Sequence, residues 1–188
     1  MAIKIYVDMG HNPRNPNAGA EGNGYKEHDI TYDIGRRLAA LLNADPNFEA
    51  RTSHSSPDEV LGTSNATSLA ARVNDANSWG ADYYISLHTN ASTAATASGI
   101  EGYAYSEASQ GYALGEGITA ALSEATGLVN RGMFVRPTLY VLRRTAMPAV
   151  LIELGYITNA GDAYLMVSEP DVFARGIYNG ILRYFGLA

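Results

Sequence analysis

Residues 3–11 read IKIYVDMGH, and this stretch sets the expected architecture of the chain. The run at residues 3–8 is short and β-rich and leads directly into a glycine, which is typical of a buried strand. The next stretch, residues 10–25 (GHNPRNPNAGAEGNGY), is rich in Gly, Asn and Pro and therefore indicates a long loop. Long loops inside compact domains commonly carry function, so this one is a candidate part of a site.

Further along the chain, strand-like and helix-like patterns alternate. Apolar residues at three- and four-residue spacing predict a helix over residues 26–42. The other expected helices are 64–78, 109–126, 161–167 and 171–185, and the other expected strands are 48–52, 82–88, 99–105, 139–142 and 148–154. Residues 127–132 are expected to be a connection. This alternation predicts an α/β fold with a mostly parallel sheet covered by helices on both faces.

Composition limits the possible classes of protein. A chain of 188 residues with 46% apolar and 17% charged residues suits one compact domain over residues 1–188 and excludes global disorder. The net charge of −6, without a long basic block, argues against nucleic acid as a partner. No apolar stretch approaches 18 residues, so we expect no membrane insertion. The N-terminus shows no signal-peptide pattern, and the oligomeric state is not predictable from these residues.

The absence of cysteine restricts metal binding to His and carboxylate side chains. Three expected strands end in such groups: the first at His11, the second at His88, and the third at Glu153. Glu27 stands at the start of the first helix. Because ligands bind beyond the carboxyl ends of parallel strands, these four side chains are expected to converge at one edge of the sheet.

The four residues match the needs of a hydrolytic zinc centre. Two imidazoles and one carboxylate, here His11, His88 and Glu27, leave a fourth tetrahedral position on Zn²⁺ for water. Zinc lowers the pKa of that water to about 7, and a second carboxylate that is not a ligand can move its proton. Glu153 is the candidate for this role, because a carboxylate inside the run PAVLIELGYI is costly to bury unless it is paired or catalytic.

Each residue also has a simpler interpretation. A lone histidine at a strand end is more often a surface or hydrogen-bonded side chain than a ligand, and we assign His28 and His54 to that class. A carboxylate in the first turn of a helix, such as Glu27, is expected because it complements the helix dipole. The hypothesis of a metal site therefore depends on the four residues occurring together.

Three blocks of the chain, in order, resemble a known enzyme family. They are VDMGHNPRNPNAGAEGNGYKEHD at residues 7–29, ARVNDANSWGADYYISLHTNAS at residues 71–92 and MPAVLIELGYITNAGD at residues 147–162. Together they resemble the zinc-dependent N-acetylmuramoyl-L-alanine amidases of the amidase-3 type, and the likeness runs over residues 4–185. One departure is the loop after the first histidine, where many members have Gly-Gly followed by Asp.

The resemblance implies zinc held by His11, Glu27 and His88, with Glu153 as the catalytic general base. It also implies a sheet of about six strands, and hydrolysis of the amide bond between N-acetylmuramic acid and L-alanine in bacterial peptidoglycan. We interpret Asn90, Glu101 and Arg143 as candidate substrate-binding residues, where Arg143 could meet a carboxylate of the stem peptide.

Two other functions remain open at this point. The same metal site would serve a zinc peptidase that cuts the stem peptide, and a non-catalytic wall-binding module is a third possibility. The expected place of action is the bacterial cell wall. A phage endolysin released from the host cytoplasm would fit, as would the excised catalytic domain of a secreted autolysin or a spore enzyme.

Overall fold

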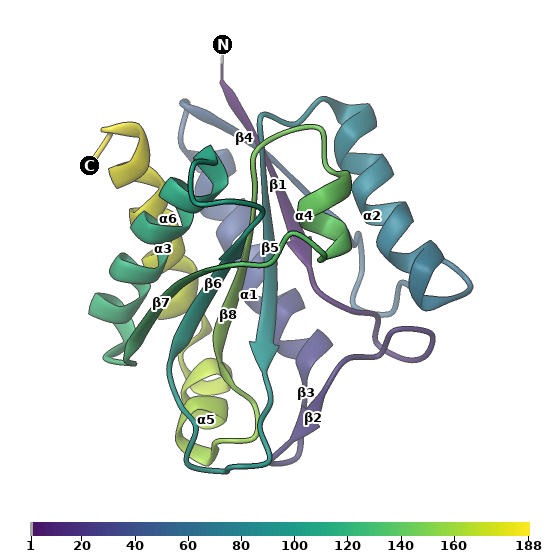
Figure 1. Cartoon of the computed structure of the whole chain (residues 1–188), viewed down its shortest axis with the longest axis vertical. Coiled ribbons are helices and arrows are strands. Elements are labelled where there is room, and N and C mark those ends of the chain that lie inside the picture. The colour runs from purple at the N-terminus through teal and green to yellow at the C-terminus, as the bar shows by residue number, and fades with distance from the viewer. Residues whose placement is uncertain (1) are drawn as a thin grey trace.

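The computed structural model describes residues 2–188, and within this range a six-stranded sheet forms the centre of the molecule (Figure 1). The strands lie in the order β4-β1-β5-β8-β6-β7. Their bounds in chain order are β1 Ile3–Met9, β4 Phe48–Thr52, β5 Tyr83–Asn90, β6 Ile100–Ala104, β7 Asn130–Val135 and β8 Ala149–Tyr156. All neighbouring pairs are parallel except β6 and β8. The predicted, mostly parallel sheet is confirmed.

Helices cover both faces of this sheet, as predicted. One face carries α1 (Glu27–Ala44), α3 (Gln110–Thr126) and α6 (Pro170–Phe185), and the other carries α2 (Asn65–Trp79) and the short α4 (Tyr140–Arg144). Figure 1 shows α2 and α4 nearest the viewer and α5 (Ala160–Ser168) at the lower end of the molecule. Among the described residues, no helix is both long and apolar enough to cross a membrane.

The alternation of side chains along β1 explains the two cores. Ile5 and Val7 point into the larger core with the apolar residues of α1, α3 and α6, while Tyr6 points into the smaller core against α2. The ring of Tyr6 stacks on that of Tyr84 on the neighbouring strand, with 5.4 Å between centroids. Successive side chains of a strand point to opposite faces of the sheet. Because both faces are covered here, successive positions of β1 must be apolar or aromatic, as they are in the sequence.

Two sequence predictions fail between residues 127 and 142. Residues 139–142 were expected to be a strand, but Leu139 caps α4 and residues 140–142 belong to it, with Val141 and Leu142 packed against the sheet. A four-residue apolar run cannot be assigned to strand or helix by periodicity alone. The expected connection at residues 127–132 runs into edge strand β7, which pairs only with β6 and has a register shift. An edge strand with polar residues and glycine lacks the apolar pattern that identifies a buried strand.

The predicted long loop at residues 10–25 is wrong at its end, where a small second sheet forms from the two-residue strands β2 (Glu21–Gly22) and β3 (Tyr25–Lys26), and the first helix begins one residue later than predicted. This hairpin brings the chain back to the carboxyl edge of β1, where α1 begins at Glu27. The loop therefore returns the first residue of a helix to the end of the strand that precedes it.

A buried ion pair joins β1 to α2 beside that edge. Nη1 of Arg72 lies 3.1 Å from Oδ1 of Asp8, and both side chains are fully buried. The hydroxyl of Ser86 on β5 donates to Oδ2 of Asp8 at 2.7 Å. Burial opposes the charge on Asp8, but the Arg72 guanidinium and the Ser86 hydroxyl outweigh it and hold the pKa of Asp8 below its usual value. The aspartate of the VDMGH stretch is thus a structural residue.

Replacing Arg72 with Ala should leave Asp8 charged, buried and unpaired. We expect this substitution to lower the free energy of unfolding by about 3–5 kcal/mol. As a matched control, Arg51→Ala breaks the exposed Arg51–Asp75 pair, whose atoms are 2.9 Å apart, and should cost under about 1 kcal/mol. Urea denaturation at pH 7 measures both values. Similar losses in the two variants would contradict the structural role given to the buried pair.

Candidate metal and catalytic site

His11 lies just beyond β1, in a backbone conformation that few side chains adopt. Its φ angle is 71°, in the left-handed region. Its ring Nδ1 lies 2.9 Å from the side-chain oxygen of Asn17, which is an acceptor. This contact places the imidazole proton on Nδ1 and leaves the lone pair of Nε2 free to bind a cation.

Gly10 allows the two histidines to approach each other. A Cβ at this position would lie 2.5 Å from the His88 ring and 2.5 Å from the carbonyl oxygen of Leu87. The amide of Gly10 donates to that same carbonyl at 2.9 Å. Only glycine can therefore hold the chain this close to β5 before the turn into His11.

Glu27, the first residue of α1, is aimed by backbone groups of two other segments. Its Oε1 accepts from the amide of Thr89 at 2.9 Å, and its Oε2 accepts from the amide of Ala20 at 2.8 Å. Burial opposes its charge, but the imidazoles of His11 and His88 beside it outweigh this effect and hold the pKa of Glu27 far below its usual value. The carboxylate is therefore fixed in its ionised form, with one oxygen facing each histidine.

The predicted ligand atoms converge. Nε2 of His11 lies 3.2 Å from Oε2 of Glu27, and Nδ1 of His88 lies 3.1 Å from Oε1. The two histidine nitrogens are 3.2 Å apart. In a tetrahedral zinc site with bonds of about 2.0–2.1 Å, ligand atoms are separated by about 3.3 Å. The contacts to the two oxygens of Glu27 are close to this separation, and one atom from each of the three residues lies within 4.8 Å of the others, so the side chains fit a small cation site.

The chemistry of this donor set also fits a cation. Nitrogen atoms of His11 and His88 and a carboxylate oxygen of Glu27 face one another. The single N–H of a neutral His11 is already donated to Asn17, so it does not point into this group. Two imidazole nitrogens at hydrogen-bonding distance without a shared proton repel each other, and a divalent ion removes that repulsion. His11, Glu27 and His88 are the group among the described residues that could hold a metal ion.

Glu153 lies beside His88 in the sheet. The two are register partners on β8 and β5, and Glu101 on the antiparallel β6 is the partner of Glu153 on its other side. Register partners project to the same face, so His88, Glu153 and Glu101 form a row across three strands. Burial, helped by the charges of Glu27 and Glu101, raises the pKa of Glu153 to about 8. Its Oε2 is buried and has no hydrogen-bond partner within residues 2–188.

The three candidate substrate-binding residues have different surroundings. Glu101 is fully engaged, since it accepts from Tyr103, Tyr156, Arg131 and the side chain of Asn90. Burial opposes its charge, but these donors hold the pKa of Glu101 below its usual value. Arg143 is exposed on α4 and, among the described residues, has no ion pair. Glu101 thus lies next to Glu153 and Asn90 contacts Glu101, whereas no contact within residues 2–188 connects Arg143 to this group.

His28 and His54 are both buried and hydrogen-bonded. The ring nitrogens of His28 lie 3.2 Å from the carbonyl oxygen of His11 and 3.0 Å from that of Pro57. His54 lies 3.3 Å from the side-chain oxygen of Asn12, which also accepts from the amide of Leu61. Both histidines therefore support the backbone beneath the ligands, and neither joins the cluster. Sequence reasoning missed Asn12 and Asn17, because an asparagine in an Asn-rich loop carries no distinguishing signal.

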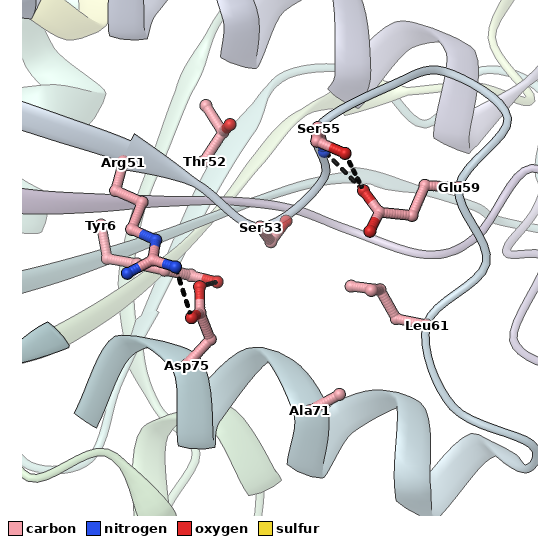
Figure 2. A pocket seen from close by; sticks show the side chains of 9 residues that line it. All are labelled: Tyr6, Arg51, Thr52, Ser53, Ser55, Glu59, Leu61, Ala71 and Asp75. Carbon is pink, nitrogen blue, oxygen red and sulfur yellow. Dashed lines mark hydrogen bonds and ion pairs between the residues drawn. The ribbon is translucent and has the colours of Figure 1, made fainter. Parts of the chain in front are cut away.

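A cavity of about 520 Å³ lies elsewhere, between the end of β4, the loop that follows it and α2 (Figure 2). None of the four predicted site residues lines it. Figure 2 shows that its polar groups pair with one another: Arg51 with Asp75, and Ser55 with Glu59. The cavity is therefore separate from the candidate catalytic centre, and its side chains satisfy each other.

The raised pKa of Glu153 has a consequence for stability. In the folded, metal-free protein Glu153 keeps its proton up to a higher pH than it does in the unfolded chain, where it has its ordinary pKa. The folded state is therefore favoured at low pH, and this contribution to stability is lost as pH rises through about 8. Glu153→Gln removes the cost of burying the charge. We expect the variant to be more stable than the metal-free wild type by about 2–4 kcal/mol at pH 9 and nearly equal to it at pH 4.5.

Denaturant unfolding in the presence of a chelator measures this difference, with Glu107→Gln on the exposed surface as the matched control. A stability difference for Glu153→Gln that does not vary between pH 4.5 and pH 9 would show that the carboxyl group is not held protonated by its surroundings.

Comparison with known proteins identifies the family. The family model described as Amidase_3, N-acetylmuramoyl-L-alanine amidase, matches residues 5–183. The amidase LytC of Bacillus subtilis is 34% identical over 96% of this chain and 35% of its own length. The amidase CwlM of Bacillus licheniformis is 34% identical over 99% of this chain and 70% of its own length.

The fold is shared as well. A crystal structure of an N-acetylmuramoyl-L-alanine amidase from Clostridium difficile 630 superposes with a TM-score of 0.86 at 28% identity, over 98% of this chain and 97% of that one. The chain spans about a third of LytC but most of the Clostridium difficile structure. With the family model matched over nearly its whole length, the chain belongs to the Amidase_3 family of N-acetylmuramoyl-L-alanine amidases, hydrolases of bacterial peptidoglycan.

Proposed function

We propose that residues 1–188 form a single catalytic domain that hydrolyses the amide bond between N-acetylmuramic acid and L-alanine with the help of zinc. His11, Glu27 and His88 would hold the ion, and Glu153 would move the protons. The observation that carries this proposal is the convergence of His11, His88 and the two oxygens of Glu27, with contacts of 3.1–3.2 Å, next to a half-buried carboxyl group whose Oε2 has no hydrogen-bond partner among the described residues.

A zinc ion at this position supplies Lewis acidity and makes a water molecule nucleophilic near neutral pH. The protein's contribution is to hold the ligands ready. Asn17 fixes the proton of His11 on Nδ1, and the amides of Ala20 and Thr89 orient Glu27. Such supporting contacts tune a metal site as strongly as the ligands themselves.

Glu153 acts as the general base and then as the general acid. Its Oε2 has no hydrogen-bond partner among the described residues, so the carboxyl group is not committed to a structural contact on that side and can accept the proton of the attacking water. A carboxyl group whose pKa is raised by burial also returns that proton readily to the amine of L-alanine as the amide bond breaks. Transfer in both directions requires a pKa near the working pH, and the surroundings of Glu153 bring it toward that range.

Neighbouring side chains would position the substrate. Glu101 is the register partner of Glu153, and Asn90 on β5 donates to Glu101; we propose that both line the path of the peptidoglycan. Arg143 remains a proposed contact for a stem-peptide carboxylate. The place of action is the bacterial cell wall, because the substrate is found there.

Digestion of purified peptidoglycan, with products read by mass spectrometry, tests the bond and the metal together. We expect release of peptides with a free N-terminal L-alanine, loss of activity with a zinc chelator, and recovery when Zn²⁺ is added back. Cleavage elsewhere in the stem peptide would show that the domain is a peptidase instead. Binding to the wall without any release would show a non-catalytic module.

The role of Glu153 is separable from that of the ligands. Glu153→Ala should lower kcat by at least about 10²-fold while bound zinc, measured by elemental analysis after dialysis, stays at one equivalent. His88→Ala should instead lose the zinc as well as the activity. Wild-type turnover in Glu153→Ala would remove this residue from the mechanism.

A further inference from the structure

The basic residues of this chain are unevenly distributed. Residues 127–152 contain four arginines, at positions 131, 136, 143 and 144, and no Asp, Glu or Lys. The remaining nine Lys and Arg share the rest of the chain with all 19 Asp and Glu. The segment includes β7, which pairs with β6 beside Glu101, and α4, whose carboxyl end contacts Asn77 of α2 at the other end of the sheet, so only its first two arginines lie toward the candidate site in an otherwise acidic protein.

Contacts lead from this stretch to the catalytic row. The guanidinium of Arg136 lies over the ring of Tyr103, 5.3 Å from its centroid, and the Tyr103 hydroxyl donates to Glu101. Glu101 is in turn the register partner of Glu153. Arg131 reaches Glu101 directly through Nε, at 2.6 Å, and lies over the ring of Tyr156. Arg131 and Arg136 are therefore connected to Glu153 through Glu101.

The two arginines differ in how much of their charge is already matched. Arg131 is paired with Glu101 through Nε, while its Nη1 makes one long bond of 3.4 Å to the carbonyl oxygen of Ser98. Arg136 is exposed and has no acidic partner within residues 2–188; its Nη1 donates to the backbone oxygen of Val135. Stacking on Tyr103 holds the guanidinium of Arg136 in place without neutralising it.

On the proposed function, we infer that Arg136, assisted by Arg131, binds the carboxylates of the stem peptide and so directs the peptide arm of the substrate across β6 and β7. Adjacent strands are about 4.8 Å apart, so β7 lies about 10 Å across the sheet from β8. An extended peptide spans that distance in about three residues. Arg136 follows the end of β7, and its side chain lies over the ring of Tyr103, whose hydroxyl contacts Glu101. When the amide bond before the first residue of the stem peptide lies at Glu153, the carboxylates further along the peptide therefore reach the arginines. The planar guanidinium group of arginine donates two parallel hydrogen bonds to a carboxylate.

The proposal predicts selectivity for charge. The substrates are a muramoyl tripeptide with free carboxylates and the same compound with those carboxylates converted to amides. Wild-type enzyme should cleave the free acid with a kcat/KM about ten-fold higher than the amide. Arg136→Gln should remove most of that preference, through KM more than through kcat, and Arg131→Gln should reduce it further.

Arg175→Gln is the matched control. Arg175 is exposed on α6, on the other face of the sheet, and has no ion pair among the described residues, so this change removes one positive charge far from β7. It should leave the preference unchanged. An unaltered preference in Arg136→Gln, with normal wild-type activity, would overturn the inference, and an equal loss in Arg175→Gln would assign the effect to net charge alone. Lack of amidase activity in the wild type would instead overturn the proposed function.

Discussion

The contact between Gly10 and β5 is the constraint on which the candidate site depends. Gly10 donates its amide to the carbonyl of Leu87, and its Cα lies so close to the His88 ring that no side chain fits there. This contact fixes the end of β1 one residue before His11 and directly beside His88. The two imidazoles can then lie 3.2 Å apart, although 77 residues separate them in the sequence. A larger residue at position 10 would push the ligands apart without removing either of them.

Stability and function make opposite demands on this edge of the sheet. Glu27, Glu101 and Glu153 bring three carboxyl groups together, and each carries a cost of burial. Two are compensated: Glu27 by histidines and backbone amides, and Glu101 by Arg131 and two tyrosines. Glu153 is not compensated, and its pKa rises accordingly. An uncompensated buried group of this kind is typical of a functional site rather than of a structural one.

Much of this arrangement could be predicted from the sequence, because it follows from strands that end in chemically distinctive residues. Parallel strands place their carboxyl ends at one edge, so His11, His88 and Glu153 had to meet if the sheet was parallel. Glu27 followed from its place at the start of the next helix. The supporting residues could not be predicted. Asn17 and the amides of Ala20 and Thr89 act through loop conformation, and the sequence pattern does not encode which asparagine or which amide will face a ligand.

The region between residues 127 and 142 was mispredicted for a related reason, and its true structure matters for the site. β6 runs antiparallel to β8, so the beginning of β6, rather than its end, lies at the catalytic edge. This direction brings Glu101 next to Glu153 and carries β7 alongside as a further, exposed strand. A polar edge strand looks like a loop in the sequence, because one of its edges is solvated and it needs few apolar residues. The same solvation keeps Arg131 and Arg136 accessible beside a buried carboxyl group. The feature that hides β7 from sequence analysis is therefore the one that allows it to serve as a binding surface.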